Sequence, residues 1–170
     1  MPVVRTAVLL FAFPAGQKLA IRGDAPWYVQ YIFNPGYGQT AFWQKQSDND
    51  VVLDGEVFDW ALVNDPNPDL TKRTDTINAA IAAMENDRGA DFGRFDLVIL
   101  VLAAPPTVPS DGGSTSAQSA HRTHAGIVTR VGDTFDFLAH EIGHAINLNH
   151  SYGSPLYKNS PWSQYGAHPQ

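Results

Sequence analysis

Two long apolar runs stand out along this chain. Val3–Phe13 ends at Pro14, and Phe95–Ala104 is interrupted only by Asp96 near its start. A strand covered on both faces has a continuous apolar run, whereas a strand with one exposed face alternates. The pattern therefore predicts two buried strands in the middle of a sheet.

A segment with helical periodicity lies between these runs. Ile77, Ile81 and Met84 share one face of a helix predicted over Asp75–Arg88, and Gly89 follows where a helix-ending glycine is favoured. The order strand, helix, strand implies a right-handed crossover between parallel strands. We therefore expect one α/β domain with a largely parallel sheet.

The remaining segments have weaker patterns. Residues 14–40 lack a clear period and are expected to be irregular, with a short helix leading into Phe42-Trp43. Val51–Val63 predicts one or two strands, with Asp54-Gly55 as a candidate hairpin turn. Pro105–His124 is rich in Pro, Gly, Ser and Thr, and it is expected to be a long loop.

Composition and charge exclude several classes of protein. The 170 residues are 44% hydrophobic and 16% charged, which is typical of a globular domain and not of a disordered chain. The net charge is −6 without a cluster of Lys or Arg, which argues against nucleic acid or an anionic membrane as a partner. The absence of cysteine excludes disulfides and thiolate metal sites. The apolar runs are too short to span a bilayer, and we expect any export signal to lie outside this chain.

The candidate chemistry lies near the end of the chain. A short strand is expected over Ala125–Val131, followed by a helix from about Phe135 that Asp133 or Thr134 can cap. That helix carries the segment HEIGHAINLNH at His140–His150. Histidines four residues apart lie on one face of a helix and can direct their imidazoles to a common point.

A third ligand and a base complete a catalytic zinc site. Glu141 is close enough on the helix to reach a water on the metal without being a ligand itself. His150 can return to His140 and His144 only if the helix stops near Asn147 and the backbone reverses, which favours Gly or Asn with positive φ. A bare His-Glu-x-x-His occurs by chance on many helices, but the third histidine at this spacing argues for Zn²⁺.

The expected chemistry is peptide hydrolysis. Zn²⁺ would activate a water and polarise the scissile carbonyl, while Glu141 takes the proton and passes it to the leaving amine. Ala125–Val128 is a candidate edge strand for pairing with an extended substrate, and an ordinary edge strand is an equal alternative.

The histidine segment resembles the metzincin pattern His-Glu-x-x-His-x-x-Gly/Asn-x-x-His, in its Asn form. Other parts are similar to the gametolysin and immune-inhibitor-A group of secreted metallopeptidases. Arg5–Pro14 is similar to the first strand of that group, Phe42–Trp60 to its short helix and following β-segment, and Phe95-Asp96 to the start of a later strand.

This resemblance implies a fold and a function. It implies a metzincin-like twisted, mostly parallel sheet with an antiparallel edge strand, a backing helix and an active-site helix. It also implies a secreted zinc endopeptidase that acts on proteins or peptides, with zinc ligands His140, His144 and His150 and general base Glu141.

One departure from the family leaves a second function open. Metzincins carry a methionine turn after the third histidine, but the methionines here are Met1 and Met84. Tyr165-Gly166 resembles the approach to that turn, so residues 1–170 are expected to be a catalytic domain that ends before its C-terminal part. The alternative is an inactive zinc-binding domain, or a fragment of a larger secreted protein that acts in recognition.

Two weaker candidate sites complete the set. His121 and His124, with Asp111 nearby, form an incomplete second metal site, and a merely exposed position is the commoner state of a loop histidine. One of three tyrosines after the motif can donate a hydrogen bond to the transition state, although packing is the more common role: Tyr152, Tyr157 and Tyr165.

Overall fold

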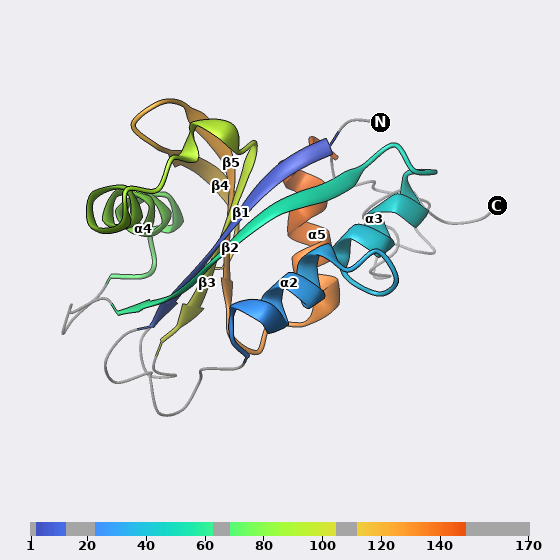
Figure 1. Cartoon of the computed structure of the whole chain (residues 1–170), viewed down its shortest axis with the longest axis horizontal. Helices are drawn as coiled ribbons and strands as arrows, with labels where there is room; N and C mark the ends of the chain where they lie inside the picture. The colour runs from blue at the N-terminus through green and yellow to red at the C-terminus, as the bar shows by residue number, and fades with distance from the viewer. Residues whose placement is uncertain (1–2, 13–22, 63–68, 105–111, 149–170) are drawn as a thin grey trace, which may run out of the picture.

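The computed structural model describes residues 3–12, 23–62, 69–104 and 112–148. Within these ranges the chain forms five strands and four α-helices (Figure 1). In chain order they are β1 (Val3–Ala12), α2 (Ala25–Phe33), α3 (Gln39–Gln46), β2 (Val52–Leu62), α4 (Arg73–Arg88), β3 (Leu97–Ala103), β4 (Gly113–Gln118), β5 (Thr123–Arg130) and α5 (Phe135–Ala145).

The five strands form one sheet in the order β2-β1-β3-β5-β4. The pairs β1–β2, β1–β3 and β3–β5 are parallel, and β4 is antiparallel to β5. The predicted α/β fold with a mostly parallel sheet and an antiparallel edge strand is therefore confirmed.

Helices cover both faces of this sheet. The chain moves from β1 to β2 in one direction and then from β2 to β3 in the other, so right-handed crossovers place the connecting helices on opposite faces. Figure 1 shows α4 on one side of the sheet and α2, α3 and α5 on the other. The helix with the candidate site is therefore packed on the face opposite α4.

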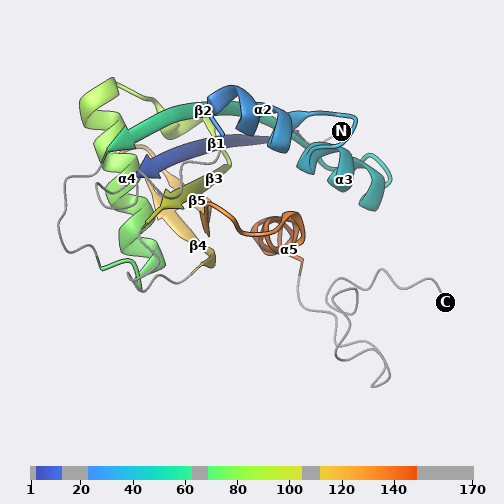
Figure 2. The same ribbon diagram turned by 90° about the horizontal axis from the view of Figure 1, so that it is seen from below.

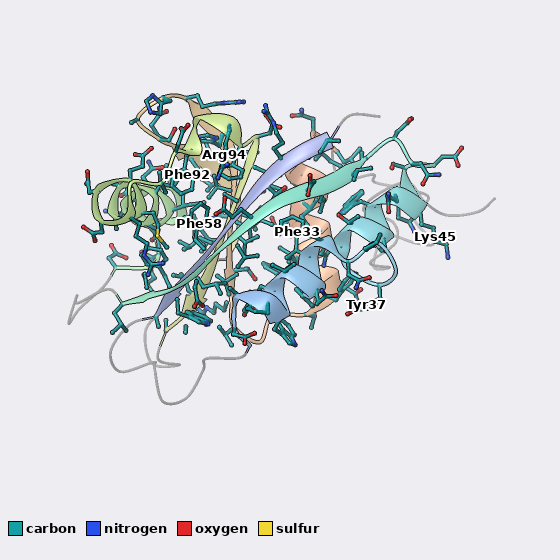
Figure 3. All side chains as sticks on the ribbon, in the orientation of Figure 1. Phe33, Tyr37, Lys45, Phe58, Phe92 and Arg94 are labelled. Atoms are coloured by element: carbon teal, nitrogen blue, oxygen red, sulfur yellow. The ribbon has the colours of Figure 1, made fainter. Side chains whose placement is uncertain are left out.

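The central strands supply the core to both faces, as their apolar runs predicted. All seven residues of β3 are buried, and Leu97–Leu102 alternate between two core clusters. Val98, Leu100 and Leu102 face the α4 side, where Phe58 and Phe92 also lie (Figure 3). Their neighbours in β3 face α2, α3 and α5 and contact residues such as Ile142 of the candidate helix.

Helix α4 confirms the predicted helix and its end. Ile77, Ile81 and Met84 are buried against the sheet. Gly89 caps the helix in a left-handed conformation with φ of 62°, which glycine adopts without steric cost.

Two weaker predictions were wrong, and a third, one or two strands over Val51–Val63, is confirmed as one strand without the candidate hairpin. Residues 25–33, expected to be irregular, form α2, whose first turn is capped by the Asp24 side chain accepting from Trp27 N at 2.9 Å. The candidate hairpin turn at Asp54-Gly55 lies inside the single strand β2, where a side chain on residue 55 would collide with Thr6 O of β1. Part of the expected loop 105–124 is strand β4, which pairs with β5 through its backbone.

Candidate metal centre

Helix α5 begins as its capping residues predict. The Thr134 side chain accepts a hydrogen bond from Phe137 N at 3.1 Å, so Thr134 is the N-cap. Asp133, the other candidate, instead accepts hydrogen bonds from Thr129 Oγ1 and Arg130 N. Leu138 and Ile142 are buried between α5 and the sheet. Their packing determines which side chains of α5 point away from the sheet.

The two histidines of α5 point their ring nitrogens at each other. His140 Nε2 and His144 Nε2 are 3.0 Å apart, and the two rings are nearly perpendicular. Two nitrogens bound to one tetrahedral zinc at about 2.0–2.1 Å would be about 3.3 Å apart. The pair therefore fits a shared metal after a change of a few tenths of an ångström.

The end of α5 holds His144 in the tautomer that a metal needs. His144 Nδ1 lies 3.0 Å from Leu148 O, and a carbonyl can only accept, so the proton is on Nδ1. The lone pair of Nε2 then points towards His140. Metal-binding histidines are commonly oriented in this way by a carbonyl on the other ring nitrogen.

The predicted backbone reversal at Asn147 is confirmed. Asn147 has φ of 69°. Leu148 N donates to Gly143 O and Asn147 N donates to His144 O, at 2.9 and 3.0 Å, which is the hydrogen-bond pattern of a Schellman motif. This turn places Leu148 O beside the His144 ring, so the same backbone reversal at Asn147 both ends α5 and orients His144.

Glu141 is buried and its two carboxylate oxygens have different surroundings. Oε2 accepts a hydrogen bond from Ser114 N at 2.6 Å, whereas Oε1 lies 3.9 Å from His140 Nε2. The residue is 8% exposed. One oxygen is thus hydrogen-bonded to the start of strand β4, while the other faces the histidine pair.

Several predicted site residues lie outside the described residues. They are His150, Asp111, Tyr152, Tyr157 and Tyr165. Among residues 3–12, 23–62, 69–104 and 112–148, no group of three or more His, Cys, Asp or Glu side chains could hold a metal. The structure therefore brings together His140, His144 and Glu141, and metal binding by His140, His144 and His150 stays a prediction.

The predicted substrate strand was wrong. Ala125–Val128 lies in β5, whose backbone is paired on one side with β3 and on the other with β4. The sheet edge next to α5 is β4 instead (Figure 2). Part of its outer edge is already engaged, because Gln118 N donates to Asn78 Oδ1 of α4.

His124 is a structural histidine and does not fit the second metal site. It is 3% exposed in β5, and its ring nitrogens lie 2.9 Å from Phe95 O and 2.8 Å from Ser119 Oγ. Burial lowers the pKa of His124, against the opposing effect of its hydrogen bond to the Phe95 carbonyl. Both ring nitrogens are engaged, and His121 is exposed on the hairpin turn.

A separate cavity of about 300 Å³ lies near the start of α5. Aromatic side chains of α2, namely Trp27, Tyr28 and Tyr31, line it together with the turn that precedes α5. Leu138 reaches this cavity but His140 and His144 do not. The histidine pair therefore belongs to a different surface.

Sequence reasoning missed the partners of Glu141 and His144. Both are backbone groups, Ser114 N–H and Leu148 C=O. Every residue except proline carries both groups, so no side-chain pattern could have indicated them.

Comparisons with protein families and with curated proteins found no match. None of the helices in the described part of the chain has the length and apolar character required to cross a bilayer.

Proposed function

We propose that this chain is a zinc-dependent endopeptidase of the metzincin type, similar to the secreted gametolysin and immune-inhibitor-A group. His140, His144 and His150 would bind Zn²⁺, and Glu141 would be the general base. The observation that carries the proposal is the arrangement of Glu141, whose Oε1 lies 3.9 Å from His140 Nε2 while Oε2 accepts a hydrogen bond from Ser114 N. A general base beside a metal-bound water needs this arrangement, with one carboxylate oxygen anchored and the other directed at the ligands.

The turn at the end of α5 supports His150 as the third ligand. A straight helix would carry residue 150 away from His144, but the left-handed Asn147 ends the helix before that happens. His150 follows Leu148 by two residues, and two residues span at most about 7 Å. Leu148 O itself lies 3.0 Å from the His144 ring, so a chain of this length would allow His150 to reach the same metal.

The residues of this chain would divide the hydrolysis between them. Bound zinc would supply a Lewis acid that polarises the scissile carbonyl and acidifies the attacking water. Glu141 Oε1 would take the proton from that water and return it to the leaving amine. Because Glu141 is buried and anchored through Oε2, its carboxylate keeps this orientation throughout the cycle.

The substrate would be a protein or peptide in an extended conformation. The edge strand β4 starts at Gly113, next to Glu141, and its exposed Ser116 lies between the engaged residues Ser114 and Gln118. An extended segment can add to such an edge through its backbone. Because Ser114 N and Ser114 O are both engaged, the added segment would pair with the edge beyond Ser114, and the reacting bond would lie beside Glu141.

A second function is favoured by one feature of the sequence. Residues 145–170 contain no methionine, whereas the family that the sequence resembles carries one after the third histidine. A zinc-binding domain that serves in recognition would show the same metal site without hydrolysis.

The test combines Glu141→Gln with measurement of bound zinc. The variant is expected to keep its zinc and to lose about 10²- to 10⁴-fold in the rate of cleavage of an unfolded protein. Glu85→Gln is a matched control, because Glu85 also accepts a backbone N–H from the β4–β5 hairpin, that of Ala120, but it lies on α4. Equal cleavage by wild type and Glu141→Gln would refute the hydrolase. Zinc binding without any cleavage by wild type would favour the recognition domain.

A further inference from the structure

The backbone of Ser114, the second residue of β4, is hydrogen-bonded to helices on both faces of the sheet. Ser114 N donates to Glu141 Oε2 of α5 at 2.6 Å, and Ser114 O accepts from Arg73 Nη1 of α4 at 3.2 Å. These helices lie on opposite faces of the sheet (Figures 1 and 2). One residue of the edge strand therefore connects the candidate base to a cation that no part of the proposed function has used.

Gly113 makes this connection possible. It is buried and has φ of +142°, a conformation that other L-residues rarely adopt. A Cβ at this position would lie 2.1 Å from Arg73 Nη1 and 3.6 Å from Glu141 Oε2. The missing side chain leaves the space in which the guanidinium and the carboxylate approach the same stretch of backbone.

The position of Arg73 in its helix indicates a role outside that helix. Arg73 is the first residue of α4, where the helix dipole disfavours a positive charge by about 0.3–1 kcal/mol. An arginine there does not stabilise α4. Its hydrogen bond to Ser114 O of β4 offsets this unfavourable interaction with the helix dipole.

We propose that Arg73 is a positioning residue for Glu141, an inference that rests on the proposed function. By holding Ser114 O, Arg73 fixes the backbone that presents Ser114 N–H to Oε2. Oε1 then stays directed at the histidine pair. Without this restraint the Ser114 backbone can rotate, and Glu141 is free to turn both oxygens towards the metal and to occupy the place of the attacking water.

The first measurement does not require metal or activity. In the zinc-free, ¹⁵N-labelled chain, the Ser114 amide proton should resonate far downfield, because short hydrogen bonds to a carboxylate are strong. Arg73→Ala is expected to move this signal upfield. Arg88→Ala is the matched control, since Arg88 is in the same helix and donates to backbone carbonyls of Asp59 and Trp60 on β2, at the other edge of the sheet.

The second measurement uses the zinc-loaded chain with a peptide substrate. Arg73→Ala should lower kcat by about 10- to 100-fold, the cost of a misplaced catalytic group, with KM unchanged within about twofold. Arg73→Lys should recover part of kcat, and added guanidinium should restore Arg73→Ala but not Glu141→Gln. Arg88→Ala should match wild type in kcat.

The outcomes separate this inference from the proposed function. An unchanged Ser114 signal in Arg73→Ala, or an unchanged kcat, overturns the positioning role even if wild type is an active peptidase. If wild type shows no cleavage, the proposed function fails, and the amide signal still decides whether Arg73 controls the Ser114–Glu141 contact. Should Arg73→Ala fold poorly, Arg73→Met, which keeps the aliphatic stem and removes the donors to Ser114 O, provides the same two comparisons.

Discussion

Replacing Asn147 tests the link between the turn after α5 and the metal site. Asn147 has φ of 69°, and the left-handed conformation costs most L-residues about 1–2 kcal/mol, which glycine avoids and asparagine partly avoids. Asn147→Ala should therefore destabilise the turn by about 1 kcal/mol, whereas Asn147→Gly should preserve it or stabilise it. The turn holds both Leu148 O on His144 and the path of the chain towards His150.

The expected effect on zinc follows from this cost. If the bound state requires the turn, a penalty of about 1 kcal/mol weakens zinc binding by about fivefold. Competition with a fluorescent zinc indicator at pH 7.5 measures this difference directly. Asn147→Gly is expected to bind zinc at least as tightly as wild type.

Asn49 provides a matched control for backbone strain alone. It also has φ of 69° but lies between α3 and β2, outside the turn that follows α5. Asn49→Ala should lower the unfolding temperature by about 2–4 °C and leave zinc affinity unchanged. The reasoning is refuted if Asn147→Ala binds zinc as tightly as Asn147→Gly, or if Asn49→Ala weakens zinc binding to the same extent.

Two further predictions concern stability. Burial, with the nearby Arg122 charge, lowers the pKa of His124 against the opposing Phe95 carbonyl and the Glu85 and Asp96 charges. As the pH falls, this histidine is therefore protonated in the unfolded chain before it is protonated in the folded chain, so the free energy of unfolding should fall below about pH 6.5. Urea titrations at pH 7.5 and 5.5 should show a smaller fall in the variant His124→Asn than in wild type. Zinc at about 100 times its Kd should stabilise the chain by about 2.7 kcal/mol and raise the unfolding temperature by about 5–10 °C; a scan with and without chelator measures this, and an unchanged temperature would count against a native metal site.

The features predicted correctly from the sequence each have a local cause. The apolar runs of β1 and β3 are continuous because both faces of these strands are covered. Gly89, Thr134 and Asn147 mark helix ends through their own backbone preferences or side-chain hydrogen bonds. Such signals are readable without knowledge of the rest of the fold.

The features that were missed depend on tertiary contacts. Strand β4 has the sequence GSTSAQ with only two buried residues, and its pairing with β5 and its contacts with α4 make it a strand. In α2 the aromatic residues obscure the period, because Trp27 is 42% exposed while Tyr28 is buried. The contact from Arg73 through Ser114 to Glu141 joins residues far apart in sequence through backbone atoms.

Zinc content of single histidine variants tests the central claim most directly. Wild type should bind one zinc ion per chain after dialysis against trace zinc, and His140→Ala, His144→Ala and His150→Ala should each lose most of it. His121→Ala, which removes an exposed histidine of the β4–β5 hairpin, should keep wild-type zinc. Equal zinc content in all four variants, or no zinc in wild type, would contradict the three-histidine centre.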